Sequence, residues 1–229
     1  MNVTVVMGYG AFLLAGLACT LAVSIAALLL GLIFGVLGCA ARLSPRRIVR
    51  QAVSGYVTLF QSLPELLVVL VVYFSGDAIL RSLARLLVDD AQVEISPFLA
   101  GALALALAMG AYVTDVLRSA YLQVPLGLRE ASNALGLKRW QSLLLIDAPQ
   151  ILRLAMPALG NLFLVVQKNS ALVSVIGLAE LMRQAQVAAG ATHDPLSFYL
   201  MAGLAYLVLA AITMALQYGL ESRLSRGMV

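Results

Sequence analysis

Charged residues are scarce in this chain: Asp, Glu, Lys and Arg together make up 11% of its 229 residues, whereas hydrophobic residues make up 62%. Mean hydropathy is +0.98. Because soluble domains carry about a quarter charged residues, this composition excludes an ordinary soluble protein. In a bilayer only helices and closed barrels satisfy every backbone polar group, and long apolar runs lack the alternation of barrel strands. We therefore predict an all-α integral membrane protein.

Residues that carry chemistry are equally few. The chain has one histidine, His193, which is followed by Asp194 and Pro195, and two cysteines, Cys19 and Cys39, which both fall in the first apolar run. Metal-ligand spacing is absent, and one histidine does not supply a nucleophile with its base. We therefore expect no catalytic residue and no metal site. The cysteines are interpreted as small buried side chains and His193 as a solvated turn residue.

Two further motifs are missing. The sequence has no G-x-x-x-x-G-K-[ST] loop, so we expect that it does not hydrolyse ATP alone. It also lacks a basic region before residue 10, which favours a true first span over a cleavable signal peptide. The net charge of +4 comes from basic residues between apolar segments, where membrane orientation explains them better than nucleic-acid binding does.

Five apolar segments reach the roughly 20 residues that a bilayer core requires. They lie near residues 10–41, 55–75, 97–120, 154–176 and 197–219. Basic residues gather after the first and third segments and in the tail: Arg42, Arg46, Arg47, Arg50, Arg118, Arg129, Lys138, Arg139, Arg153, Arg223 and Arg226. The other loops carry Arg81, Arg85 and Arg183 beside Asp77, Asp89, Asp90, Glu94, Glu180 and Asp194. The positive-inside rule therefore predicts an N-terminus outside and a C-terminus in the cytoplasm.

Two of the spans have internal features. Pro64 and Glu65 fall within the second apolar window, so either one helix covers 55–75 or a helix begins at Pro64 after a separate segment, 55–63. Proline favours the second arrangement because it is tolerated best in the first turn of a helix. In the first span, small residues recur at four-residue steps, at Ala27, Gly31 and Gly35, which predicts close packing against another helix.

A polar interruption between spans 3 and 4 has strict internal spacing. It runs from Glu130 to Pro149 with the sequence EASNALGLKRWQSLLLIDAP, and its predicted location is cytoplasmic. Gly136 can take the left-handed conformation that ends a helix, and Pro149 is expected to stop a second helical piece. Small side chains would let a partner's backbone come close, and they stand at Ala131, Ser132 and Ala134. We predict a helix-turn-helix docking surface.

This segment resembles the signature cytoplasmic loop of binding-protein-dependent ABC importer permeases, which reads E-A-A, three residues, G, nine residues, I, one residue, L, P. The matching positions are Glu130, Ala131, Ser132, Gly136, Ile146, Ala148 and Pro149. Other similar segments are Ser62–Leu67, Pro157–Asn161, Lys168–Leu172 and Val175–Leu181. Together they are similar to the polar amino-acid permeases, in particular to the arginine, ornithine, histidine and opine subunits.

The resemblance implies a single permease domain over residues 1–229, in the cytoplasmic (inner) membrane of a bacterium and surrounded by its lipid. The coupling loop, 121–153, would dock on a dimer of separate ATPase subunits, which bind the ATP and Mg²⁺, so this chain would hold no cofactor. A second permease subunit, different or identical, would complete the pathway. A periplasmic or lipid-anchored binding protein would deliver a polar, cationic amino acid, and nucleic acid has no part in such a system.

Charged and polar residues inside the spans are candidates for the substrate pathway. Glu65 either faces a cavity and meets a cationic substrate or complements the dipole at a helix N-terminus. Lys168 must find water, a carboxylate or carbonyl groups, and pairing at a subunit interface is the preferred interpretation. The remaining candidates are Asn161, Gln167, Asn169 and Ser170, which are also suited to hydrogen bonding between helices.

The resemblance is incomplete at two of these positions. Family members that bind cationic amino acids often carry acids where this chain has Leu162 and Asn169, so the main pocket is expected either here or in a different partner permease. An alternative hypothesis is a stand-alone secondary transporter or channel in which Glu65 and Lys168 form an ion relay. Five spans without an inverted repeat fit that alternative poorly.

Two further acids receive structural interpretations. Asp115 precedes Arg118 by three positions, which predicts an ion pair along one helix face. Glu180 lies in a predicted external loop, where we expect it to be solvated rather than in contact with a binding protein.

Overall fold

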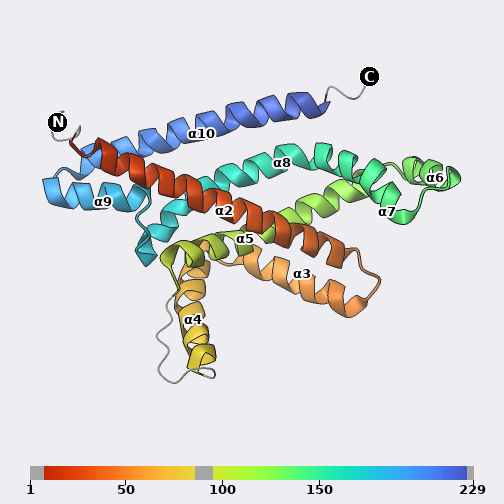
Figure 1. The fold of residues 1–229 in the computed structure, drawn as a ribbon, viewed down its shortest axis with the longest axis horizontal. Coiled ribbons are helices and arrows are strands. Elements are labelled where there is room, and N and C mark those ends of the chain that lie inside the picture. Colours follow the sequence, from red (N-terminus) through yellow and green to blue (C-terminus); the bar gives the residue numbers. More distant parts are fainter. Residues whose placement is uncertain (1–7, 86–94, 226–229) are drawn as a thin grey trace.

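The computed structural model describes residues 8–85 and 95–225, and the regular structure within them is helical (Figure 1). Four long helices run along the molecule: α2 (Gly10–Arg42), α5 (Pro97–Gln123), α8 (Ala148–Asn169) and α10 (Pro195–Ser225). Four helical segments are long and apolar enough to cross a membrane, and a bent pair brings the number to five. The all-α membrane fold is confirmed. The acids Asp89, Asp90 and Glu94 and the basic Arg226 lie outside the described residues.

The seam between α2 and α5 is the tightest contact in the bundle. A Cβ atom on Gly31 would lie 3.1 Å from the Met109 sulfur, and one on Gly35 would overlap the Val113 side chain. Ala27, one turn earlier, is fully buried. The predicted small-residue stripe therefore packs against α5, because removing side chains lets the two backbones approach closely.

The second apolar segment is broken at Pro64. Helix α3 (Arg47–Ser62) ends one residue before the extended Leu63, and α4 (Glu65–Arg85) starts at Glu65 with a bend of 113° between the two. The Pro64 carbonyl accepts hydrogen bonds from the amides of Leu67 and Val68 in the first turn of α4. The arrangement with a helix beginning at Pro64 is therefore the observed one, although the preceding segment is a helix that starts at Arg47 rather than at Gly55.

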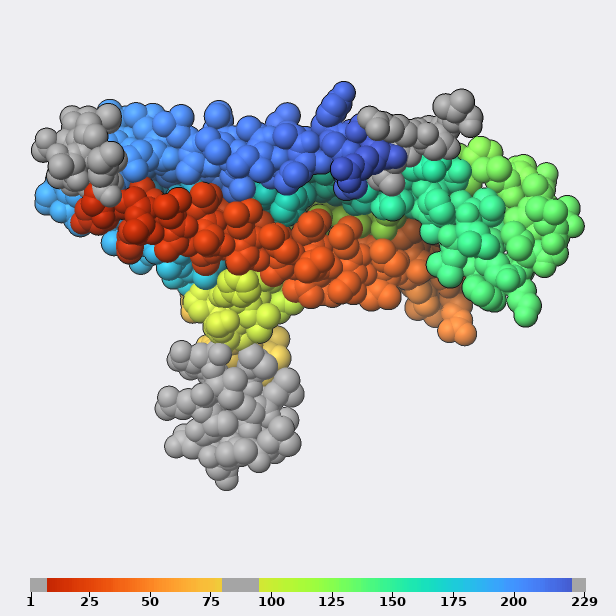
Figure 2. All heavy atoms as spheres, turned by 45° about the horizontal axis from the view of Figure 1, so that its top comes forward, coloured from red at the N-terminus to blue at the C-terminus, as the bar shows by residue number. Residues whose placement is uncertain are grey.

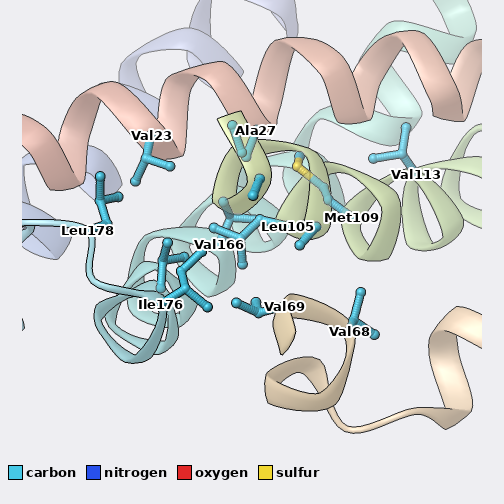
Figure 3. Packing of buried hydrophobic residues seen from close by; sticks show 14 of the residues in the cluster. Val23, Ala27, Val68, Val69, Leu105, Met109, Val113, Val166, Ile176 and Leu178 are labelled. Atoms are coloured by element: carbon cyan, nitrogen blue, oxygen red, sulfur yellow. The ribbon is translucent and has the colours of Figure 1, made fainter. Parts of the chain in front are cut away.

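The main core joins α2, α4, α5 and α8 and the 3₁₀ turn η2 (Ser170–Ile176). Figure 3 shows its apolar side chains meeting between these elements, with α4 below α5. The labelled members are Val23, Ala27, Val68, Val69, Leu105, Met109, Val113, Val166, Ile176 and Leu178. The core fixes the start of α4 beside the end of α8, and this placement creates the membrane pocket described below.

The two ends of the molecule differ in construction. At one end, η2 turns at the left-handed Gly177 into α9 (Leu181–Thr192), which packs on α2 and α10. At the other end, α6 (Leu126–Ala134) and α7 (Arg139–Ser142) project beyond the long helices. Figure 2 shows α2 and α10 lying along one face, with the α6 and α7 segment forming the far end.

Candidate functional site

The Glu130 to Pro149 loop forms the predicted helix and turn. The Gly136 amide donates to Asn133 and the Leu137 amide donates to Ser132, which is the hydrogen-bond pattern of a Schellman cap. Gly136 has a φ of +73°, a conformation that glycine adopts without steric cost. The prediction that Gly136 ends the helix in the left-handed conformation is confirmed.

The exposed face of this loop differs in one respect from the prediction. Glu130, Ala131 and Ala134 are exposed, but Ser132 is only 2% exposed. Its hydroxyl lies 2.8 Å from the Ser142 hydroxyl, which joins α6 to α7. The expected role of Ser132 in direct docking is therefore wrong, because its side chain points into the loop and not toward a partner.

Two large apolar side chains complete the exposed face, and sequence reasoning missed them. Leu135 is 79% exposed and Trp140 is 60% exposed. Trp140 is the single tryptophan of the chain, and its position in a polar loop was a usable signal. Exposed aromatic and aliphatic anchors are typical of protein interfaces.

The second half of the loop runs directly into a membrane span. A five-residue π-helix, η1 (Leu143–Asp147), joins α7 to α8 without a break. Pro149 is the second residue of α8 and lies within this continuous helical run, directly after the π-helix. The prediction that Pro149 stops the second piece is therefore wrong. Ile146 is half-buried at this junction.

Arg129 ties the loop to the ends of two long helices. Its Nε donates to Asp147 Oδ1 at 2.9 Å, and a terminal nitrogen donates to the Tyr121 carbonyl at 3.0 Å. The guanidinium carbon lies 4.0 Å from the centre of the Tyr121 ring. The planar arginine fork serves both acceptors and the aromatic face at once.

A small, mostly apolar pocket of about 10 Å³ lies among the spans and contains polar side chains at one part of its wall. Glu65, in the first turn of α4, accepts a hydrogen bond from the side-chain amide of Asn169 at the end of α8. The pocket that they line also includes Tyr112 of α5 and apolar side chains. Two of the predicted pathway residues, 104 positions apart, are thus brought together.

The other predicted pathway residues lie elsewhere. Gln167 is buried and exchanges hydrogen bonds with Thr213 of α10, and the Ser170 hydroxyl donates to the Gln167 carbonyl. Gln167 therefore joins α8 to α10, whereas the Ser170 hydrogen bond is local to the turn between α8 and η2. Asn161 and Lys168 are exposed and do not line the pocket around Glu65.

Two other cavities are larger but are lined by apolar side chains. They have volumes of about 300 and 350 Å³ and lie between α2 and α10. Their walls come from apolar residues such as Leu17 and Leu204, so these cavities offer no charged group to a polar substrate.

The expected partner of Asp115 is wrong. Asp115 forms an ion pair with Arg42 of α2 and also accepts a hydrogen bond from Gln61 of α3 at 2.9 Å. Arg42 in turn donates to Ser54. The tertiary fold thus brings a cation from another helix to Asp115, in place of Arg118 on the same face.

The expected exposure of Glu180 is also wrong. The residue is fully buried and forms the N-cap of α9, where the amides of Met182 and Arg183 donate to its carboxylate. Hydroxyl groups of Thr20 and Tyr206 donate to the same group. Burial raises the pKa of Glu180, and the four hydrogen bonds oppose the shift. By contrast, His193 is an exposed turn residue with a φ of +55°.

The described residues form helices of membrane-spanning length, an exposed helical loop at one end and a small pocket among the spans, an arrangement that suits a permease subunit. Over residues 27–226 the sequence matches the family described as binding-protein-dependent transport system inner membrane component. The chain belongs to this family. It is thus a multi-pass inner-membrane protein whose ATPase is a separate chain and whose transport system includes a binding protein. Family membership decides against the stand-alone transporter.

Relatives cover almost the whole chain. The octopine transport system permease protein OccQ of Rhizobium radiobacter is 42% identical over 221 residues, covering 96% of this chain and 93% of the relative. The histidine/lysine/arginine/ornithine transport system permease protein HisQ of Escherichia coli K12 is 32% identical over 220 residues, covering 96% of both. A solved structure titled as an amino acid ABC transporter with histidines matches with a TM-score of 0.83 and 28% identity. It covers 97% of this chain and 99% of that one.

Proposed function

We propose that this permease conducts a cationic amino acid or an opine. The observation that carries the proposal is the half-buried Glu65 carboxylate, which lies beside Asn169 in an otherwise apolar pocket. A carboxylate inside a membrane span is costly unless it faces a cavity, and its negative charge suits a guanidinium or ammonium group. The names of the relatives, which include octopine and arginine, support the same substrate class.

The test is uptake by proteoliposomes that contain the assembled transporter. Glu65→Gln retains the shape of the side chain and removes its charge, so we expect uptake of arginine and octopine to fall at least tenfold. Asn161→Asp is the matched control, because it alters charge at an exposed residue of α8 away from the pocket. Unchanged uptake by an assembled Glu65→Gln transporter would remove Glu65 from the pathway.

The α6 and α7 segment is the proposed docking site for the ATPase. The exposed Glu130, Leu135 and Trp140 offer a carboxylate and two apolar anchors on one short helical hairpin. Gly136 sets the angle between its two halves. ATP and Mg²⁺ would stay on the ATPase dimer, with no cofactor bound by this chain. Loss of co-purification with the ATPase after Glu130→Ala or Gly136→Val is the expected result, and full retention by both variants contradicts the proposal.

A second permease subunit is proposed to cover the pocket. Large apolar side chains are exposed along α4, the helix that begins at Glu65, and they include Leu66, Val71 and Phe74. Lipid does not solvate the carboxylate, whereas a facing subunit would enclose it in an aqueous path. Whether that subunit is identical or different is decided by copurification of two differently tagged copies of this chain. The proposed orientation keeps the N-terminus outside and places the α6 end in the cytoplasm, in line with its basic residues.

A further inference from the structure

Helix α6 has little packing of its own. Ser132 is its single buried residue among the nine positions, and α6 makes few contacts outside α7 and η1. A helix of this length is not stable alone in water. Besides the backbone that joins it to α5 and α7, α6 is held to the rest of the protein by a small number of side-chain links, of which the Arg129 contacts are the most extensive.

Asp147, which accepts the hydrogen bond from Arg129, lies at the junction of two helical segments. Asp147 is 6% exposed and is the last residue of the π-helix η1, directly before α8 begins. The signature pattern of the loop leaves this position unspecified, so its role is not part of the motif. Single π turns inside helices recur at functional sites. Here the π turn precedes a continuous α8 that ends at Asn169, at the Glu65 pocket.

The geometry of α8 connects the two candidate sites. Its 22 residues span about 33 Å at 1.5 Å per residue. One end is held by Asp147 and the other bears Asn169. Pro157 lies inside α8 without interrupting it, so the helix transmits a displacement along its axis provided that the link at its base is maintained.

We propose that the Arg129–Asp147 ion pair is the link that transmits movement of α6 to α8, and hence to the membrane pocket. This inference rests on the proposed docking of α6 on the ATPase. The buried Asp147 carboxylate and the Arg129 guanidinium, which donates to two acceptors, fix both the distance and the orientation of α6 relative to the start of α8. A single apolar contact would not fix the orientation. Arg129 and Asp147 are positioning residues: neither touches the substrate.

The experiment measures movement of α8 without requiring a known substrate. In the assembled transporter, with Cys19 and Cys39 replaced by alanine, Val165→Cys places one thiol on α8 at the pocket. Its labelling rate by a maleimide is compared without nucleotide and after trapping with ATP and vanadate. In the otherwise unchanged protein we expect the two rates to differ at least fivefold, in line with typical coupling between sites.

Asp147→Asn and Arg129→Met are expected to bring this ratio close to one while ATPase co-purification and vanadate trapping persist. The double variant Arg129→Asp with Asp147→Arg restores the pair with reversed charges, and we expect it to recover the ratio. Arg50→Met, on an exposed part of α3, is the control that keeps the full ratio.

Three outcomes overturn the proposal: a full ratio in Asp147→Asn, no difference between the two states in the otherwise unchanged protein, or loss of co-purification in the single variants. The last result assigns the pair to docking and not to transmission. Co-purification that survives Glu130→Ala and Gly136→Val contradicts the docking proposal instead, so the two failures are distinguishable.

Discussion

Glu180 and Glu130 occupy opposite ends of the bundle and have opposite environments. Glu180 is fully buried at the start of α9 and accepts four hydrogen bonds from three helical elements. Glu130 is exposed on α6. From sequence position and motif alone, Glu180 was expected to be solvated and Glu130 to be functional.

The two glutamates show how burial changes the role of one residue type. A buried carboxylate must be satisfied by its own chain, so it holds helices together. An exposed carboxylate has no such task and is available to a partner. The buried carboxylate at the α9 end thus stabilises the fold, and the exposed carboxylate at the α6 end is free for the proposed contact with a partner.

Glu180→Ala should give the largest effect of the variants considered. It removes the N-cap of α9 and leaves the Thr20 and Tyr206 hydroxyls without their acceptor, at a combined cost of about 3 kcal/mol. Thermal unfolding of the purified protein in detergent is the measurement. Glu130→Ala is the matched control, with stability expected within about 0.5 kcal/mol of the unmodified protein. Equal losses in both variants would erase the distinction between the two ends.

Gly35→Ala tests whether tight packing extends beyond the α9 end. The added methyl group would overlap Val113, so we expect a loss of about 1–3 kcal/mol despite the better helix propensity of alanine. Gly203→Ala in α10, where the new methyl meets no neighbour within 4 Å, should be neutral or stabilising. The same unfolding assay reads both variants. A neutral Gly35→Ala would mean that the seam relaxes without cost.

Trp140→Ala tests whether the exposed side chains at the α6 end bind a partner. Because Trp140 is 60% exposed, its removal should leave the unfolding temperature unchanged. Binding to the ATPase should weaken about tenfold or more if the side chain is an interface anchor. Titration of the labelled ATPase against detergent-solubilised permease measures this affinity, with Tyr218→Ala, an exposed aromatic residue of α10, as the control. Equal affinity in both variants would place the interface elsewhere.

The pH dependence of stability is the smallest expected effect. Burial raises the pKa of Glu180 above its ordinary value of 4.5, so the folded protein binds this proton more tightly than the unfolded chain does. The resulting stabilisation is complete below 4.5 and is lost as pH rises through the folded pKa. Relative to Glu180→Gln, the unmodified protein should therefore lose stability as pH rises from about 4.5 toward neutrality.

Asp194, a half-buried acid at the start of α10, has a pKa shift of the opposite sign and serves as the internal comparison. Hydrogen bonds from the Ser197 side chain and backbone lower the pKa of Asp194, so its contribution is present above the ordinary value of 3.8 and is lost as pH falls further. Unfolding curves measured across this acid range for Glu180→Gln and Asp194→Asn separate the two groups. Parallel curves for all three proteins would contradict both assignments.

Local features were predictable from the sequence because they depend on neighbouring residues. The apolar spans, the helix start at Pro64 and the left-handed Gly136 all follow from composition or from the backbone preferences of proline and glycine. The stripe of Ala27, Gly31 and Gly35 was equally visible, since a helical period of 3.6 residues places four-residue steps on one face. Pro149 failed as a stop signal because the helical run passes from α7 through the π-helix η1 into α8 without a break.

The sequence by itself thus determined that this chain spans a membrane, lacks a phosphate-binding loop and carries the permease coupling motif. Only the tertiary structure decided which charged groups meet: Glu65 with Asn169, Asp115 with Arg42, and Glu180 with Tyr206. The physical reason is distance along the chain. The first two of these pairs join residues 104 and 73 positions apart, and such contacts depend on how whole helices pack rather than on any local preference.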